Sequence, residues 1–233
     1  MAAAGSGRRL GAGGPKAFVE LAGRPLLHHS LVAVAAAERI GAAVVAAPPG
    51  AEARCGEIAR AIGGLDVTVV AGGSTRADSV AAALGACEGG LVLVHDAARP
   101  LAPAELFDAV AGRLSSEPEA DAVVAAAPIT DTVKRGLGPH RAPPEMGVVE
   151  ETVPRDRLWA AQTPQGFRLA ALREAQRAAE REGRLAEATD EARLIELAGG
   201  RVLLEPAPAA NLKITVPADL GLAEALLAAS ERV

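Results

Sequence analysis

Five short apolar runs alternate along the chain with stretches of helical spacing, and this alternation limits the possible folds more than any other feature. The runs cover residues 43–47, 67–70, 91–94, 122–126 and 202–204. Continuous apolar strands that alternate with amphipathic helices are typical of a parallel sheet covered by helices on both faces. The sequence therefore predicts an α/β fold of the doubly wound, Rossmann-like kind, with a mostly parallel sheet.

The predicted helices lie between these runs and beyond them. They are expected at residues 26–40, 53–62, 74–87, 103–114, 169–182, 190–197 and 217–229. The alternation breaks between residues 130 and 152, where several glycines and prolines lie close together. A long Pro/Gly-rich excursion within a compact domain is usually functional or disordered. No linker separates two independent units, so we expect residues 1–233 to form a single domain.

The composition argues against several classes of protein. Hydrophobic residues make up 50% of the 233 residues and aromatic residues 2%, so Ala, Val and Leu must build the core. A net charge of -5 with no Tyr argues against a nucleic-acid surface, which needs basic and stacking side chains. No apolar run approaches the ~20 residues of a membrane span. Cys55 and Cys87 fit neither a disulfide framework nor a zinc site, which favours a cytoplasmic protein.

The N-terminal segment has the composition of a phosphate-binding loop. Gly5 and Gly7 allow backbone N–H groups to approach a phosphate closely, and Arg9 and Lys16 carry positive charge. The Walker loop is excluded because Lys16 is followed by Ala17 instead of Ser or Thr. The segment therefore predicts a polyphosphate ligand, and a flexible structural turn is the alternative.

Lysine is rare in this chain. Of the 24 basic residues only Lys16, Lys134 and Lys213 are lysines, in a sequence rich in Ala, Gly and Arg. Any position at which Arg serves equally well is free to drift to Arg in such a background. The three lysines are therefore candidates for positions that need a compact ammonium group. Three leftover surface residues are the alternative.

Polar clusters also follow two of the predicted strands. Residues 72–79 lie between a strand and a helix, where open α/β sheets bind ligands, although Thr75 and Asp78 also have the spacing of a capping box. Asp96 directly follows the most apolar strand and is well placed to hold Mg²⁺ between phosphate oxygens. A structural turn in which Asp96 pairs with Arg99 is the alternative.

Taken in order, these clusters resemble the 2-C-methyl-D-erythritol 4-phosphate cytidylyltransferases of the non-mevalonate isoprenoid pathway. The string at residues 95–100 is specific to this family and its close relatives, such as ribitol-phosphate cytidylyltransferases. All three lysines fall on motif positions. The matching pieces are Ala3-Ala4-Gly5-x-Gly7-x-Arg9, Pro15-Lys16, Gly72-Gly73-x-x-Arg76-x-x-Ser79-Val80, His95-Asp96-Ala97-Ala98-Arg99-Pro100, Asp131-Thr132-x-Lys134, Thr163-Pro164-Gln165 and Asn211-x-Lys213-Ile214-Thr215.

The resemblance implies a nucleotidyltransferase fold with a protruding dimerisation arm at roughly residues 130–158. It also implies transfer of CMP from CTP to the 4-phosphate of methylerythritol, with pyrophosphate leaving and Mg²⁺ required. By the same resemblance, Arg9, Lys16 and Lys213 neutralise charge at the transferring phosphate, and Asp96 holds the metal.

The resemblance further implies which residues hold the two substrates. Those expected to bind CTP are Ala3, Ala4, Gly5, Gly73, Ser74, Ser79 and Ala97. Those expected to bind the sugar phosphate are Thr132, Arg155 and Arg99. Thr132 and Arg155 would do so in the partner's site, within a homodimer that exchanges arms.

Some positions depart from the family pattern. Ala17 stands where Gln is usual, Ser74 replaces a common acidic residue, and Ala210 stands where an acidic residue usually precedes Asn211. The phosphate loop normally follows a strand, so we expect the true start to lie upstream by ~5 to 10 residues. The alternatives are the same chemistry on another polyol phosphate, such as ribitol 5-phosphate, and a degenerate nucleotide-binding protein without turnover.

Overall fold

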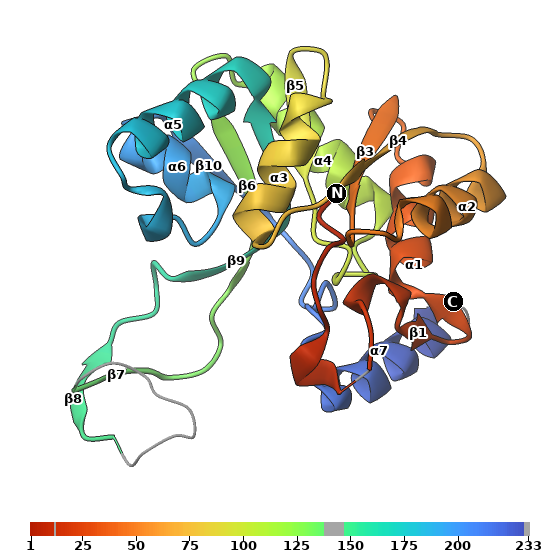
Figure 1. The fold of residues 1–233 in the computed structure, drawn as a ribbon. Helices are drawn as coiled ribbons and strands as arrows, with labels where there is room; N and C mark the ends of the chain where they lie inside the picture. The colour runs from red at the N-terminus through yellow and green to blue at the C-terminus, as the bar shows by residue number, and fades with distance from the viewer. Residues whose placement is uncertain (12, 138–146, 231–233) are drawn as a thin grey trace.

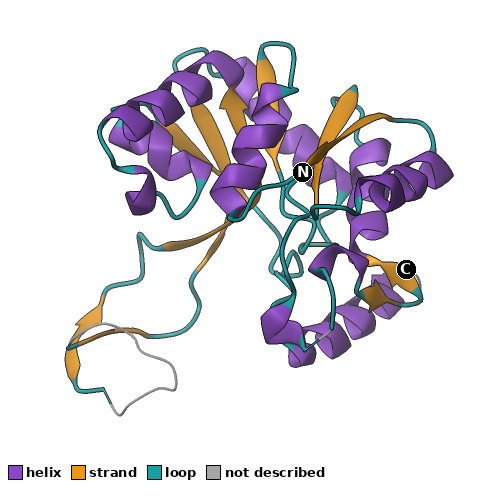
Figure 2. Ribbon diagram, viewed as in Figure 1, coloured by secondary structure: helices purple, strands orange, loops and turns teal. Residues whose placement is uncertain are grey.

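The largest sheet of the protein has four strands in the order β10-β6-β9-β5 (Figures 1 and 2). They are β10 (Val202–Pro206), β6 (Ala122–Pro128), β9 (Trp159–Arg168) and β5 (Leu91–Val94). The structure is a computed structural model that describes residues 1–11, 13–137 and 147–230. Strand β10 is parallel to β6, whereas β9 runs antiparallel to both β6 and β5.

The helices lie close to the ranges expected from the sequence. Their bounds are α1 (Leu26–Ala36), α2 (Glu52–Ile62), α3 (Arg76–Gly85), α4 (Ala104–Ser116), α5 (Leu169–Arg181), α6 (Glu191–Leu197) and α7 (Pro217–Ser230). None of these helices is both long and apolar enough to cross a membrane, within the ranges that the structure describes.

Helices cover both faces of the four-stranded sheet. Successive side chains of a strand point to opposite faces, and β6 follows this rule. Val123 and Ala125 pack with α4 on one face, whereas Ala122 and Val124 pack with α3, α5 and α6 on the other. This arrangement confirms the α/β architecture.

A second, two-stranded sheet pairs β3 (Ala42–Ala47) with β4 (Asp66–Ala71) in parallel. The first residues of the chain connect it to the larger sheet. Ala2 forms parallel bridges to Ala46 and to Asp96, and its N–H donates to the carbonyl of His95 at 2.8 Å. The carboxyl ends of β3 and β5 therefore meet at the N-terminal segment.

The prediction of a mostly parallel sheet is not confirmed, because the four-stranded sheet is mixed. Strand β9 returns from the arm and therefore enters the sheet in the opposite direction to its neighbours. Strand β9 was not predicted from the sequence because Gln162, Thr163 and Gln165 interrupt its apolar pattern. These polar side chains are buried in the folded protein.

A hairpin projects from the body of the molecule (Figure 1). It pairs β7 (Val133–Gly136) with β8 (Val149–Val153) in antiparallel register. The hairpin lies within the predicted arm at 130–158, of which residues 138–146 lie outside the described part. Val148 and Val149 are exposed on it, at 65% and 55%.

A small apolar cluster ties the two ends of the chain together. Leu10 follows the N-terminal loop, and Ile214 lies next to Lys213, yet both are buried in one core with Leu21 and Leu26. Leu21 belongs to a short hairpin of β1 (Glu20–Leu21) and β2 (Arg24–Pro25), against which α7 packs. This cluster fixes the loop and the C-terminal segment relative to one another.

Candidate active site

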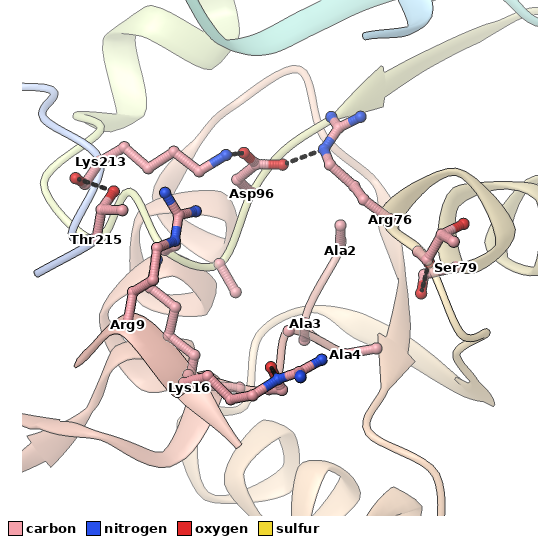
Figure 3. Close-up of a pocket in the computed structure, with 18 of the residues that line it drawn as sticks. Ala2, Ala3, Ala4, Arg9, Lys16, Arg76, Ser79, Asp96, Lys213 and Thr215 are labelled. Carbon is pink, nitrogen blue, oxygen red and sulfur yellow. Dashed lines mark hydrogen bonds and ion pairs between the residues drawn. The ribbon is translucent and has the colours of Figure 1, made fainter. Parts of the chain in front are cut away.

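A pocket of about 540 Å³ opens where the two sheets meet (Figure 3). Three segments build its wall. One follows Ala2, which bridges β3 to the residue after β5, and the other two follow the carboxyl ends of β4 and β5. Open α/β sheets bind ligands at this kind of edge. The lining residues that were predicted from the sequence are Ala3, Ala4, Gly5, Arg9, Lys16, Gly73, Ser74, Ser79, Asp96, Ala97 and Lys213.

The N-terminal loop curls around one side of the pocket. Gly7 has a φ of 68°, which is a left-handed conformation, and a Cβ there would lie 2.7 Å from the carbonyl oxygen of Gly14. Gly5 has open space where its side chain would be, and its carbonyl accepts a hydrogen bond from the N–H of Lys16 at 2.9 Å. The two glycines therefore have different uses: Gly7 permits the turn, and Gly5 leaves room for a ligand.

The loop before α3 forms the opposite side. Thr75 and Asp78 form the capping box that their spacing indicates. The Ser79 hydroxyl accepts from the N–H of Gly73 at 3.1 Å and donates to the carbonyl of Thr75 at 2.8 Å. Ser74 donates to the Asp78 carboxylate at 2.7 Å. Both hydroxyls therefore hold the loop in shape while they line the pocket.

Asp96 is the acidic centre of the pocket, and two cations approach it from opposite sides (Figure 3). Its side chain is only 8% exposed, Arg76 Nε lies 2.9 Å from one carboxylate oxygen, and Lys213 Nζ lies 2.6 Å from the other. Burial opposes the negative charge, but Arg76 and Lys213 outweigh it and hold the pKa of Asp96 well below its usual range.

A second carboxylate stands behind Arg76. Glu191 begins α6, its side chain is 6% exposed, and its Oε1 lies 2.8 Å from Arg76 Nη1. Burial raises the pKa of Glu191, and the nearby Arg76 offsets this only in part. The same two carboxylates raise the pKa of Arg76 in spite of its burial. Arg76 therefore stays charged and bridges Asp96 to α6.

Arg9 and Lys16 face the same cavity without a carboxylate of their own. Within the described residues, no acidic side chain lies within ion-pair distance of either. Burial lowers the pKa of Lys16 to about 8, and the nearby charge of Lys213 adds to this effect. Positive charge that is crowded in this way favours binding of an anion.

His95 lies beside the pocket rather than in its lining. Its Nδ1 is 3.0 Å from the hydroxyl of Thr163, and its ring packs edge-on against Phe107. Burial lowers the pKa of His95 to about 3, so the imidazole is neutral at pH 7. This placement is that of a buried residue at the end of a strand rather than that of a general base.

Comparison with known proteins identifies the family. Residues 1–229 match the family described as IspD: 2-C-methyl-D-erythritol 4-phosphate cytidylyltransferase. The chain belongs to this family. The cytidylyltransferase of Deinococcus radiodurans is 44% identical over 96% of this chain and 86% of its own length. The crystal structure of the cytidylyltransferase from Thermus thermophilus has a TM-score of 0.75 and 38% identity, covering 97% of this chain and 96% of that one.

Some relatives are longer. The bifunctional enzyme IspD/IspF of Anaeromyxobacter dehalogenans is 47% identical over 98% of this chain. The match covers 56% of that relative's length. The chain thus spans little more than half of this bifunctional relative of the IspD family.

The three residues expected to bind the sugar phosphate lie outside the pocket lining. Thr132 is exposed just before β7, and Arg155 donates to the carbonyl of Thr130 at the base of the projecting hairpin. Arg99 donates from Nη1 to the carbonyl of Asn211 at 2.6 Å. The structure of one chain thus brings together the expected nucleotide residues but not the expected acceptor residues.

Sequence reasoning assigned no role to the residues that support the pocket from behind. The N–H of Asp96 donates to the Thr163 hydroxyl at 3.1 Å, and Asn211 Nδ2 donates to the Thr163 carbonyl at 2.9 Å. Glu191 was likewise not predicted. The motifs around Thr163 and Asn211 marked both positions, but only the fold shows that they touch each other.

Proposed function

We propose that the chain transfers CMP from CTP to the 4-phosphate of 2-C-methyl-D-erythritol and releases pyrophosphate. One observation carries this proposal: a single pocket gathers Arg9, Lys16 and Lys213 around a glycine loop and beside Asp96. The pocket lining holds five cationic side chains, Arg8, Arg9, Lys16, Arg76 and Lys213, and one carboxylate, which suits a triphosphate because it carries more negative charge than a mono- or diphosphate. The names and sequences of the relatives support the choice of CTP and of the acceptor.

In this proposal an oxygen of the acceptor's phosphate attacks the α-phosphorus of CTP in line with the leaving group. A new P–O bond forms, and the bond to the β-phosphate breaks, so that pyrophosphate leaves with the electron pair. Such a reaction needs positioning and charge neutralisation more than proton transfer. Arg9, Lys16 and Lys213 supply that neutralisation at the five-coordinate phosphorus. The neutral, bonded state of His95 supports leaving it out of the chemistry.

The rest of the lining would hold the nucleotide. Ala3, Ala4 and Gly5 line the cavity on one side, and Gly73, Ser74, Ser79 and Ala97 line it elsewhere. We assign the cradling of CTP and the selection of cytosine to these residues. The Ser74 hydroxyl is already engaged by Asp78, so its contact to the base would use its remaining acceptor capacity.

A divalent cation, Mg²⁺ in our proposal, would be held chiefly by the phosphates of CTP. No group of three acidic, His or Cys side chains with metal-site geometry occurs within the described residues. Asp96 is the one carboxylate in the lining, which fits Mg²⁺ because this ion often takes one protein carboxylate and several phosphate oxygens. When bound, the ion would neutralise charge on the phosphates.

The acceptor site is proposed to be completed by a second copy of the chain. Thr132 and Arg155 lie on or beside a hairpin that projects away from its own body (Figure 1). In a homodimer that exchanges arms, these two residues would bind the sugar phosphate in the partner's pocket, with Arg99 nearby on the body. The two free cysteines support placing this dimer in the cytoplasm.

Pyrophosphate release tests the proposed function. The chain is supplied with CTP and Mg²⁺, and methylerythritol 4-phosphate and ribitol 5-phosphate are offered in separate reactions. We expect release with methylerythritol 4-phosphate and a much lower rate with ribitol 5-phosphate. Preference for ribitol 5-phosphate would change the acceptor, and no release with either would favour a binding protein without turnover.

A further inference from the structure

Glu191 is a buried carboxylate that lies next to the pocket without lining it. Its side chain is 6% exposed, and its Oε1 lies 2.8 Å from Arg76 Nη1. Its other oxygen, Oε2, is buried and accepts no hydrogen bond within the described residues. A buried acceptor without a partner is costly, and native proteins satisfy most such atoms. The reaction proposed above gives Glu191 no task.

The start of α6 fixes the position of Glu191. The residue before it, Asp190, caps this helix by accepting a hydrogen bond from the N–H of Arg193 at 3.0 Å. The second carboxylate oxygen of Asp190 accepts from Gln165 Nε2 at 2.8 Å. Gln165 belongs to β9 and is itself buried. The start of α6 is therefore tied to the four-stranded sheet, and Glu191 is held in place beside Arg76.

Arg76 is shared between two carboxylates. Its Nε donates to Asp96 at 2.9 Å and its Nη1 donates to Glu191 at 2.8 Å, whereas its Nη2 donates to no residue in the part of the chain that the structure describes. A guanidinium can form two parallel hydrogen bonds with one carboxylate. Nη2 of Arg76 and Oε2 of Glu191 are an unused donor and an unused acceptor on two residues that already touch. Arg76 can therefore pair with Glu191 through both nitrogens.

Asp96 has a cation at each of its two carboxylate oxygens. Arg76 Nε lies at one, and Lys213 Nζ lies 2.6 Å from the other (Figure 3). Asp96 must give up at least one of these bonds to hold the divalent cation of a bound nucleotide. Lys213 is 40% exposed in the pocket lining, so it can turn to a phosphate. Arg76 is less exposed, at 30%, and needs another carboxylate when it leaves Asp96.

We propose that Glu191 is a positioning residue, which receives Arg76 when Asp96 turns to the ligand. Arg76 then pairs with Glu191 through Nη1 and Nη2, and Oε2 of Glu191 gains its hydrogen bond. The guanidinium is paired before and after this exchange, so Asp96 can change partners without leaving a cation unpaired. The inference rests on the proposed function, since it takes Asp96 as the residue that meets the cation of the bound nucleotide.

The negative charge of Glu191 makes the direction of a mutational effect informative. A carboxylate near an anionic ligand repels it, so neutralising Glu191 would by itself strengthen the binding of CTP. The positioning role predicts the reverse. Gln at this position offers Arg76 no charged partner, so Arg76 stays on Asp96 and CTP binds more weakly.

Calorimetric titration with CTP and Mg²⁺, in the absence of an acceptor, tests the proposal. We expect Glu191→Gln to raise the Kd of CTP about tenfold and Glu191→Asp, which keeps the charge, to recover most of the affinity. The control is Glu196→Gln, which removes an exposed carboxylate of the same helix that pairs with Arg193, and it should leave Kd unchanged. In an Arg76→Gln background, Glu191→Gln should cause no further weakening.

Equal or tighter binding of CTP by the Glu191→Gln variant would overturn the proposal. A further loss of about tenfold in the Arg76→Gln background would also overturn it, because Glu191 would then act independently of Arg76. Equal weakening by Gln and Asp would assign the effect to packing and would overturn it as well. Each Kd is measured below the Tm of its variant, so that lost stability does not count as weaker binding.

The failure of the proposed function would give a different result. A wild-type chain that binds CTP but releases no pyrophosphate with either acceptor would contradict the proposed function. The comparison of Kd values among the Glu191 variants would keep its meaning in that case, because it is made without an acceptor and without turnover.

Discussion

The pocket and the projecting hairpin hold their charged groups in opposite ways. In the pocket, Asp96 is bonded by Arg76 and by Lys213, which is 117 positions away in the sequence. In the hairpin, Lys134 bonds to Thr152 and Arg135 pairs with Glu151 across one exposed ladder. The fold thus fixes the charged side chains of the pocket through contacts between distant segments, whereas the contacts of the hairpin's charged side chains stay within the hairpin. Side chains near the hairpin can form part of a binding site only when a second surface packs against them.

The largest contrast should come from removing the pocket's carboxylate. Asp96→Asn leaves Arg76 and Lys213 without their shared partner, so we expect kcat/KM to fall by about a hundredfold or more. Asp131→Asn, beside the hairpin, is the matched control and should keep near wild-type activity. The measurement is steady-state pyrophosphate release with both substrates varied. An Asp96→Asn enzyme whose kcat/KM stays close to that of wild type would contradict the role of the pocket.

The lysines give a second, finer contrast. Lys16→Arg and Lys213→Arg keep the charge but replace a compact ammonium with a planar fork, so we expect each to lower kcat by at least about tenfold. Lys134→Arg makes the same replacement in the hairpin, where the side chain is exposed, and should change kcat little. Equal effects at all three positions would remove the distinction between the two regions.

Substitutions near the hairpin should change the KM for the acceptor and leave the KM for the nucleotide unchanged. Thr132→Ala and Arg155→Ala should raise KM for methylerythritol 4-phosphate by about fivefold, while KM for CTP and Tm stay near wild type. Arg135→Ala removes a nearby exposed cation that pairs with Glu151 and serves as the control. If KM for CTP rises in parallel, Thr132 and Arg155 belong to the nucleotide site instead.

The smallest effect is a dependence on pH that arises in the pocket. Burial, together with Lys213, lowers the pKa of Lys16 to about 8, although Asp96 opposes this shift and Arg9 adds to it. If Lys16 binds CTP as proposed, its charged form should bind better, so kcat/KM for CTP should fall as pH rises through this value and reach about half at the pKa. Lys16→Arg should show no such fall over the same range. A wild-type profile that stays flat to about one pH unit above this pKa would contradict the assignment.

Much of the body could be predicted from local pattern. The runs at 43–47, 67–70, 91–94 and 122–126 coincide with β3, β4, β5 and β6, and the helices begin within a few residues of their expected starts. Burial on both faces imposes an apolar pattern on these strands, and that pattern is visible in sequence. Strand β9 could not be predicted from the apolar pattern, because its polar residues lie in the core, where hydrogen bonds satisfy them.

The site could be predicted only as far as its ligand-facing residues. Glycines and cations in the expected clusters do line one pocket. The supporting contacts of Glu191, Thr163 and Asn211 join segments that are distant in sequence, and no local spacing encodes them. The acceptor residues near the hairpin follow from the family resemblance alone, because one chain does not bring Thr132 or Arg155 into its own pocket.

Complementation between two impaired variants, assayed at methylerythritol 4-phosphate concentrations well below KM, tests most directly whether one copy's hairpin serves its partner's pocket. The Lys213→Ala variant has a damaged pocket and an intact hairpin. The double variant Thr132→Ala/Arg155→Ala has an intact pocket and lacks the two acceptor-binding side chains near the hairpin. Random pairing in a homodimer restores one complete site in each mixed dimer, so co-expressed chains should recover up to about a quarter of wild-type activity. Activity no higher than the sum of the two separate variants would contradict the account.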